Sequence, residues 1–267
     1  MTNNNQNKPF PSQLFIDILY LWQKRQIGLK QVLRWSRFSH SDDRWGKSLL
    51  NIESILRKIC CFLRSAPVRE QNCLQHTDSL SWLTNLVIGM IKESAPYLDY
   101  NLLAAVPALH DEGEDELKRD IAFIKKNNGH DLAEYKAFRS RYAGLEKASN
   151  SAFTHIHQAF LLQFCLEIPE NFPKDARLIM SELAEKKQIE ARLFNALEHI
   201  DYILFALEQY LTRGHAEILF KITNKSLPVV TDHAQHIPAL EKHLWTKQVQ
   251  DNFARFLKEN HNSLWIE

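Results

Sequence analysis

Apolar side chains recur every three or four residues along most of the chain, a spacing that places them on one face of a helix. Glycine is rare, with seven in the chain, and alternating β-branched runs are few, so helices are expected nearly throughout. The pattern predicts an all-α fold. Its helices span 11–27, 29–38, 44–66, 76–93, 102–109, 117–126, 130–147, 152–167, 174–212 with a break near Lys187, 216–223 before a loop around Pro228, and 238–258.

Composition narrows the class of protein. The 267 residues are 45% hydrophobic and 24% charged, which suits one large globular domain with a sizeable core. With 33 basic against 32 acidic side chains, neither nucleic acid nor an anionic membrane is the expected partner. No apolar run approaches the roughly 18 residues of a membrane span, and the polar start of the chain has no signal-peptide core. The four cysteines lack Cys-x-x-Cys spacing, so we expect no zinc knuckle, no disulfide frame and a cytoplasmic location.

The most informative stretch begins at the apolar run Leu102–Leu109, which leads directly into His110 and Asp111. Gly113 and several acids follow. A core helix that ends here would bring a histidine and a carboxylate to one point, because glycine lets the backbone turn. An imidazole nitrogen and a carboxylate oxygen suit a divalent metal. The alternative is a helix C-terminus that carries a stabilising histidine, followed by a solvated acidic turn.

Further polar residues lie where the pattern predicts core. His76 precedes Leu80 by one turn on the same helix face, so it points inward, either as a hydrogen-bonded core histidine or as a metal ligand. Asp201 lies inside an apolar arc of the 174–212 segment, with Glu198 at the edge of that arc. A carboxylate in such a position is costly unless it pairs with a basic side chain or binds a metal.

In chain order these residues are a histidine, a His-Asp pair and then an acid, which resembles the HD-domain superfamily of metal-dependent phosphohydrolases. More narrowly, the chain looks like the bacterial HD-domain 5′-deoxynucleotidases. Three blocks carry the resemblance: R-E-Q-N-C-L-Q-H (Arg69–His76), A-L-H-D-E-G-E (Ala108–Glu114) and E-A-R-L-F-N-A-L-E-H-I-D-Y-I-L-F-A-L-E (Glu190–Glu208). The resemblance implies an HD-domain helical bundle over 65–212. Helical extensions are then expected at 10–64 and 213–267, with a disordered tail at 1–9.

By this resemblance His76, His110 and Asp111 are ligands of one divalent metal ion, which could be manganese, cobalt, zinc, iron or magnesium. An ungapped comparison of the third block places the last metal acid at Glu198, where the family has aspartate. The extra methylene still lets Glu198 reach an ion if the helix lies slightly further back. Asp201 follows one turn later and is the substitute for this ligand.

The resemblance also implies two catalytic acids. Glu114 would position water or transfer a proton, and Asp120 would be the further acid of the box, although it lies one residue further from the His-Asp pair than in the family. The Arg-Trp pair that the deoxynucleotidases carry before the first histidine block is Cys61-Phe62 here, which bears on substrate specificity. The basic candidates for binding the phosphate are Arg69, Lys118 and Arg119.

The expected reaction is hydrolysis of a small phosphate ester, such as a nucleotide monophosphate. A second hypothesis is a non-catalytic helical binding module on a degenerate HD scaffold, which the substituted acid, the missing Arg-Trp pair and the terminal helices favour. An iron-dependent HD oxygenase would need further histidines, and the spacing of His130, His155 and His157 matches no such pattern. The terminal extensions would either cap the pocket or build a homodimer contact.

Overall fold

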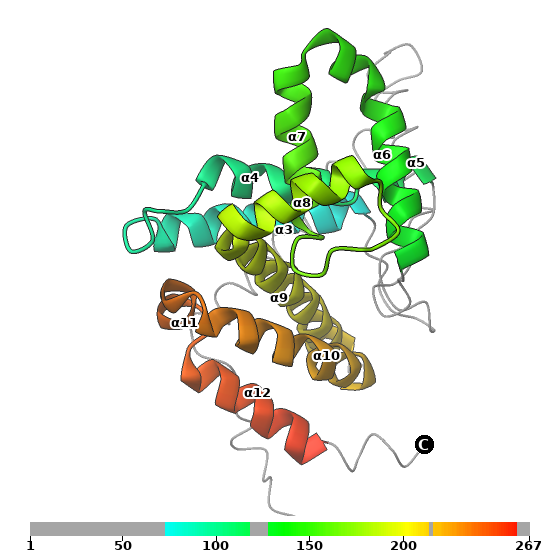
Figure 1. Cartoon of the computed structure of the whole chain (residues 1–267). Helices are drawn as coiled ribbons and strands as arrows, with labels where there is room; N and C mark the ends of the chain where they lie inside the picture. The colour runs from blue at the N-terminus through cyan, green and yellow to red at the C-terminus, as the bar shows by residue number, and fades with distance from the viewer. Residues whose placement is uncertain (1–72, 118–127, 214–215, 261–267) are drawn as a thin grey trace, which may run out of the picture.

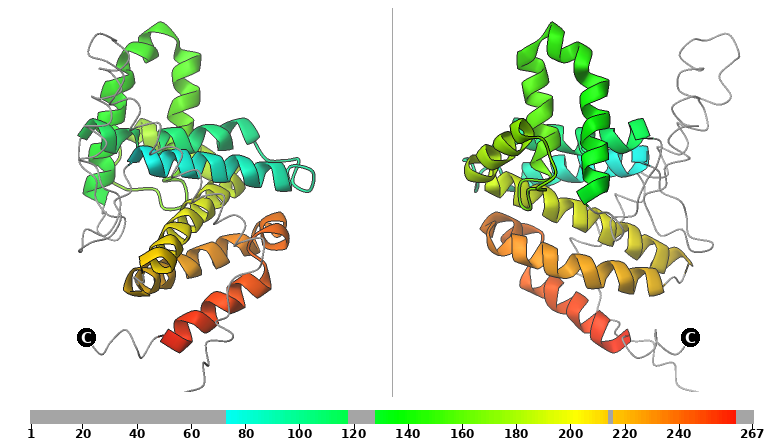
Figure 2. Two further views of the ribbon diagram at one scale, coloured as in Figure 1. Left: turned by 180° about the vertical axis from the view of Figure 1, so that it is seen from behind. Right: turned by 45° about the vertical axis from the view of Figure 1, so that its right-hand side comes forward.

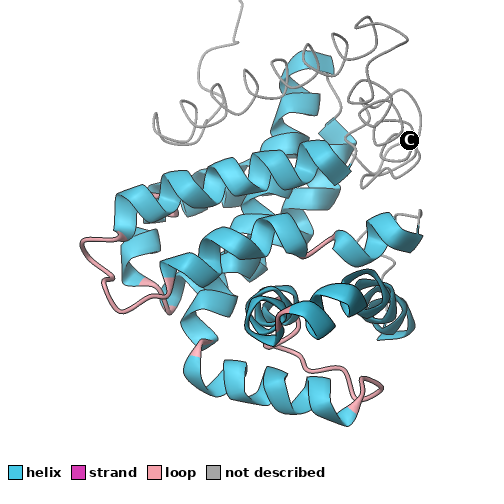
Figure 3. Cartoon of the chain, turned by 90° about the horizontal axis from the view of Figure 1, so that it is seen from above, coloured by secondary structure: helices cyan, strands magenta, loops and turns pink. Residues whose placement is uncertain are grey.

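The computed structural model describes residues 73–117, 128–213 and 216–260. Short connections apart, these residues are helical, and none of them forms a strand (Figure 3), which confirms the predicted all-α class. The predicted helices before residue 73 and the one at 117–126 lie outside the described residues, except Leu117. The helices are α3 (Cys73–Ile91), α4 (Tyr100–Leu109), α5 (Glu112–Leu117), α6 (Asn128–Ala148), α7 (Asn150–Leu162), α8 (Lys174–Lys186), α9 (Gln188–Arg213), α10 (Ala216–Gln235), α11 (Pro238–His243) and α12 (Lys247–Asn260).

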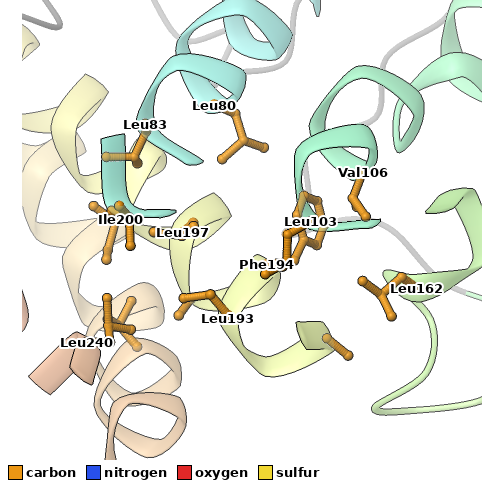
Figure 4. Close-up of a cluster of buried hydrophobic side chains, with 14 of the residues drawn as sticks. Leu80, Leu83, Leu103, Val106, Leu162, Leu193, Phe194, Leu197, Ile200 and Leu240 are labelled. Carbon is orange, nitrogen blue, oxygen red and sulfur yellow. The ribbon is translucent and has the colours of Figure 1, made fainter. Parts of the chain in front are cut away.

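Helix α9 is the element around which the others are arranged (Figure 1), and it contacts α3, α4, α8 and α10. The predicted break near Lys187 is confirmed, since α8 ends at Lys186 and α9 begins at Gln188. The apolar stripe of α9 packs into one cluster with side chains of α3, α4 and α11 (Figure 4). Five of its six predicted members are buried: Leu193, Leu197, Ile200, Leu204 and Leu207. The side chain of the sixth, Leu211, is not among the described ones.

Helices α6 and α7 form an arch whose top projects beyond the other described helices, as both views of Figure 2 show. Ser149 separates them and caps α7, because its hydroxyl accepts a hydrogen bond from the backbone N–H of Ala152 at 3.4 Å. Helix α7 packs against α4, and α5 packs against α6. The pair therefore reaches the end of α4, where the His-Asp doublet lies. Helix α7 ends at Leu162, five residues before the predicted end at Glu167.

The predicted loop around Pro228 is wrong, since α10 continues through it to Gln235. Proline removes one helical hydrogen bond, here to the carbonyl of Asn224. Both Asn224 and Pro228 lie on the exposed side of α10, so water can solvate that carbonyl. The opposite side, including Ile222 and Val230, is buried. Packing against α9 therefore holds α10 in helical form despite the proline.

The predicted single helix at 238–258 is also wrong, because Leu244 and Trp245 interrupt it. Their backbone N–H groups both donate to the carbonyl of Leu240, at 2.9 Å each, which closes the first helix. Thr246 then starts α12 by accepting a hydrogen bond from the N–H of Val249 at 3.3 Å. The interruption lets both the indole ring of Trp245 and the side chain of Leu244 enter the core, where both are buried.

The helices after residue 213, predicted as an extension, share the core of the preceding ones. Figure 2 shows α10 between α9 and α12, and α11 contacts α3. Side chains from all three C-terminal helices, such as Ile222, Leu240 and Phe253, belong to the same buried cluster as α3 and α4. No described helix combines the length and the apolarity that crossing a membrane requires.

Candidate metal centre

His76, His110 and Glu198 meet in one buried group that could hold a metal ion. His76 comes from the first turn of α3, His110 from the residue that ends α4, and Glu198 from the middle of α9. Each side chain offers one ligand atom, and the three atoms all lie within 4.8 Å of one another. Residues that are far apart in the sequence are thus gathered at the junction of three helices. Sequence reasoning predicted all three as metal ligands.

The spacing of the two rings fits a shared ion. The Nε2 atoms of His76 and His110 are 3.3 Å apart. Two nitrogens that each bind one ion at about 2.0–2.1 Å come to about 2.8–3.0 Å from each other at an octahedral angle and about 3.3–3.4 Å at a tetrahedral angle. Asp111, the third predicted ligand, places its Oδ2 3.2 Å from Nε2 of His110 and 3.9 Å from Nε2 of His76. Oε1 of Glu198 lies 4.0 Å from Nε2 of His110.

The backbone at the end of α4 orients His110. Its Nδ1 donates to the carbonyl of Pro107 at 2.9 Å, which leaves Nε2 directed toward His76 and Asp111. The side-chain amide of Gln163, just after α7, donates to the carbonyl of His110 at 2.9 Å. Only 1% of the His110 surface is exposed. The ring and the backbone of this residue are therefore both held by hydrogen bonds.

Asp99 fixes the other end of α4. It caps the helix by accepting from the N–H of Leu102 at 3.1 Å, and its other oxygen accepts from Nζ of Lys187 at 2.9 Å. The hydrogen bond from Lys187 lowers the pKa of Asp99. The N–H of Asp99 donates to Oε1 of Glu190 in α9 at 2.8 Å. The register of α4 against α9 is thus set at the end opposite the metal group.

His76 lies between an acid and an aromatic ring. Its Nδ1 donates to Oδ2 of Asp201 at 2.9 Å, and the ring of Tyr202 stacks on it with centroids 5.4 Å apart. Burial by itself would lower the pKa of His76, but the hydrogen bond to Asp201 and the charges of Asp201, Asp111 and Glu198 raise it to about 9. The surroundings thus favour positive charge at this site, as a binding place for a cation requires.

Glu198 is held by its own helix. The hydroxyl of Tyr202, one turn later, donates to Oε1 of Glu198 at 2.7 Å. The side chains of Glu198 and Asp111 are 19% and 12% exposed, whereas those of His76 and His110 are nearly closed to solvent. The carboxylates therefore form the side of the group that faces water.

The remaining predicted residues fall into two groups. Glu114 is 3% exposed and lies in α5, where its backbone N–H donates to the carbonyl of Asp111 at 3.0 Å. The alternative placed a solvated acidic turn after the doublet, but the stretch is a helix instead, and Glu114 within it is buried. The other four lie outside the described residues: Arg69, Lys118, Arg119 and Asp120.

Sequence reasoning missed Tyr202 and Gln163. For Asp201 it offered either an unnamed basic partner or a place as substitute metal ligand, whereas the side chain pairs with His76. The spacing of four residues between Glu198 and Tyr202 was a usable signal, since side chains at this spacing meet on a helix. No sequence signal connects Gln163 with His110. Among the described residues, no second group of metal-ligating side chains forms.

Comparisons of the chain with protein-family models, with curated proteins and with solved structures each found no match. The HD-family resemblance therefore stays a prediction that the three sequence blocks carry. The buried His/His/Glu group is a property of the fold itself.

Proposed function

We propose that the protein is a metal-dependent phosphohydrolase of the HD type, which acts on a nucleotide monophosphate or a similar phosphate ester. The observation that supports this most is the meeting of His76, His110 and Glu198 from three helices in one buried group. With Asp111 beside them, the donors are two imidazoles and two carboxylates, a mixed set that suits manganese, cobalt, zinc or iron. A divalent ion bound here would lower the pKa of a water molecule and offset the charge of a phosphate group.

The side chains of this site divide the remaining work. The carboxylates of Asp111 and Glu198 lie on the side of the group that solvent reaches, so a substrate would approach from there. Glu114 is the candidate for proton transfer, because it is a buried carboxyl in the helix that directly follows Asp111. Arg69, Lys118 and Arg119 remain the predicted contacts for the phosphate. Binding the substrate between these groups and the metal would orient it for attack by water.

Phosphate release by metal-loaded protein tests the proposal. The purified chain would be stripped with a chelator and loaded separately with Mn²⁺, Co²⁺, Zn²⁺, Fe²⁺ and Mg²⁺. Each form would then be offered a panel of ribo- and deoxynucleoside monophosphates. We expect release of inorganic phosphate with at least one metal and none with the stripped protein. His110→Ala and Asp111→Ala are each expected to lower the rate by about 100-fold or more, since each removes charge stabilisation at the reacting group.

His236→Ala is the matched control, because this histidine is exposed between α10 and α11. Its activity should equal that of the wild type. Unchanged phosphate release in both the His110 and Asp111 variants would remove the proposal. So would the absence of activity with every metal and every nucleotide in the panel.

A helical binding module on an inactive HD scaffold is the second candidate, and one observation favours it. The polar atoms of the group also lie within hydrogen-bond distance of one another, with Nε2 of His76 3.3 Å from Nε2 of His110 and Nδ1 of His76 2.9 Å from Asp201. Such a network can serve to specify a buried core. Elemental analysis separates the two candidates. About one metal ion per chain supports the hydrolase, whereas no metal and no rescue by Mn²⁺ or Co²⁺ supports the module.

A further inference from the structure

We infer that Asp201 and Tyr202 are positioning residues of the metal centre, which act through His76 and Glu198 and do not themselves bind the ion. This inference rests on the metal site of the proposed function. It keeps Glu198 as the predicted ligand of α9 and gives Asp201, predicted as the substitute for that ligand, a supporting role instead.

Asp201 lies on the far side of the His76 ring from the metal group. Its Oδ2 is 2.9 Å from Nδ1 of His76, whereas Nε2 of the same ring faces His110 at 3.3 Å. A carboxylate that accepts from Nδ1 keeps the proton on that nitrogen, so Nε2 is the nitrogen of this ring that would bind a metal. Asp201 is completely buried, so this hydrogen bond is protected from competition by water. The side chain is thus placed to select the tautomer of His76.

Tyr202 contacts both of the ligands on this side. Its hydroxyl donates to Oε1 of Glu198 at 2.7 Å, and this oxygen is the one that lies 4.0 Å from Nε2 of His110. Its ring stacks on His76 with an interplanar angle of 19°. A single side chain therefore limits the rotation of one ligand and the tilt of another.

The spacing along α9 makes this arrangement feasible. Residues 198, 201 and 202 are three and four positions apart, so they share one face of the helix. Glutamate has one more rotatable bond than aspartate and would lose more freedom on binding a metal. The hydrogen bond from Tyr202 restricts Glu198 before any ion arrives. A glutamate at this position is thus compatible with a rigid site.

Co²⁺ binding separates a positioning role from a ligand role. The affinity of stripped protein for Co²⁺ would be measured by competition with a chelator, and the visible absorption of the bound ion would report its ligand set. We expect Asp201→Ala to weaken binding by about 10- to 100-fold, the usual effect of removing a hydrogen-bond partner of a metal ligand, with an unchanged absorption spectrum. Asp201→Asn keeps an acceptor but loses the charge, so its affinity should lie between those of the wild type and Asp201→Ala.

Two comparison variants and one control complete the design. Glu198→Ala removes a ligand and should change the Co²⁺ spectrum as well as the affinity. Tyr202→Phe keeps the stacked ring and should weaken Co²⁺ binding several-fold without changing the spectrum. Asp251→Asn, on the exposed face of α12, is the matched control for Asp201→Asn and should bind as the wild type does.

The inference is overturned if Asp201→Ala changes the spectrum as Glu198→Ala does, because Asp201 would then be a ligand. Wild-type affinity in Asp201→Ala overturns it too. Should Asp201→Ala fail to fold, as judged by circular dichroism, the same two criteria apply to Asp201→Asn. Wild-type protein that follows these expectations with Co²⁺ but releases no phosphate would leave the inference intact and remove the hydrolase proposal.

Discussion

The surroundings of a buried histidine decide its charge, and two histidines of this protein show opposite outcomes. Burial alone would lower the pKa of His76, but Asp201 and the neighbouring acids raise it to about 9. At His157 burial again lowers the pKa, and the positive charge of Arg139 lowers it further, so the pKa falls to about 4. The ring of His157 packs among the aromatic side chains of Tyr135, Phe138 and Phe153. Its Nε2 has no hydrogen-bond partner among the described residues.

The shift at His157 predicts a specific dependence of stability on pH. The pKa of His157 in the folded chain, about 4, lies below the ordinary 6.5. Above pH 6.5 the ring is therefore neutral in both the folded and the unfolded chain, and it adds no pH dependence to stability. As the pH falls from about 6.5 toward 4, the unfolded chain takes up a proton that the folded chain does not. The free energy of unfolding then falls by up to about 1.4 kcal/mol per pH unit.

His157→Phe removes this titration and keeps an aromatic ring. Urea unfolding of both proteins at several pH values between 7.5 and 5 would measure the effect. The wild type should lose stability relative to His157→Phe as the pH falls below about 6.5. A difference between the two proteins that stays constant over this range would contradict the prediction.

At the scale of elements, the junction of α5 with α6 depends on one glycine. A Cβ at Gly113 would lie 2.4 Å from the carbonyl oxygen of Glu134 and 2.7 Å from its Cα. Backbone atoms of a packed helix cannot move aside as a flexible side chain can. The absence of a side chain at Gly113 therefore sets how closely α5 approaches α6, directly after the His110-Asp111 doublet.

Gly113→Ala should destabilise the fold by about 1–3 kcal/mol, the usual cost of forcing an extra methyl group into a packed contact. It should also weaken metal binding, because the displaced α5 follows Asp111 without a break. Chemical unfolding and Co²⁺ affinity would measure the two effects.

Gly89→Ala is the control: it lies in α3 with no atom within 4 Å of the added Cβ. This control should gain about 0.5–1 kcal/mol. Equal stability of the two variants would contradict the prediction.

Sequence periodicity predicted the helices where one apolar stripe decides the structure. The positions Leu80, Leu83, Val87 and Ile91 of α3 are all buried, and the break at Lys187 is where the pattern placed it. The pattern failed at Pro228 and at Trp245, where tertiary packing overrides a local preference. Pro228 is tolerated in α10 because the carbonyl of Asn224, which loses its helical hydrogen bond, faces water. The predicted helix at 238–258 is interrupted because the core accepts the buried indole of Trp245. Neither circumstance is visible in the local sequence.

The candidate site was partly predictable for a similar reason. Ligand residues are unusual in an apolar pattern, so His76 and the His110-Asp111 pair stood out. The choice between Glu198 and Asp201 as the metal ligand depends on which carboxylate lies on the Nε2 side of the His76 ring. To know that, one must know the rotation of α9 about its own axis. Partners such as Gln163 come from helices whose contact with α4 has no sequence signal. Both the rotation of α9 and the partners of α4 are seen only in the folded structure.

At the scale of the whole molecule, the candidate ligands connect α3, α4 and α9, which are elements of a single core. An ion that binds all three helices binds the folded chain only. Stabilisation then follows the ratio of free metal to Kd, and it reaches about 2.7 kcal/mol when free metal is about 100 times Kd. The metal is therefore expected to stabilise the entire fold.

Chemical unfolding of stripped and metal-loaded protein tests this expectation. In the wild type, Mn²⁺ or Co²⁺ should raise the free energy of unfolding by an amount that grows with metal concentration. His110→Ala should show no such increase, while His236→Ala should behave as the wild type does. Equal stabilisation of the His110 variant and the wild type would show that the metal binds elsewhere.

The two rings that face each other in this centre have acceptors of different kind behind them. Nδ1 of His76 donates to the side-chain carboxyl group of Asp201, whereas Nδ1 of His110 donates to a backbone carbonyl. The stronger acceptor makes its imidazole the more electron-rich donor. If a divalent ion is held here, His76 would therefore be the stronger of the two imidazole donors. His110 would be the one that an incoming oxygen donor displaces more easily.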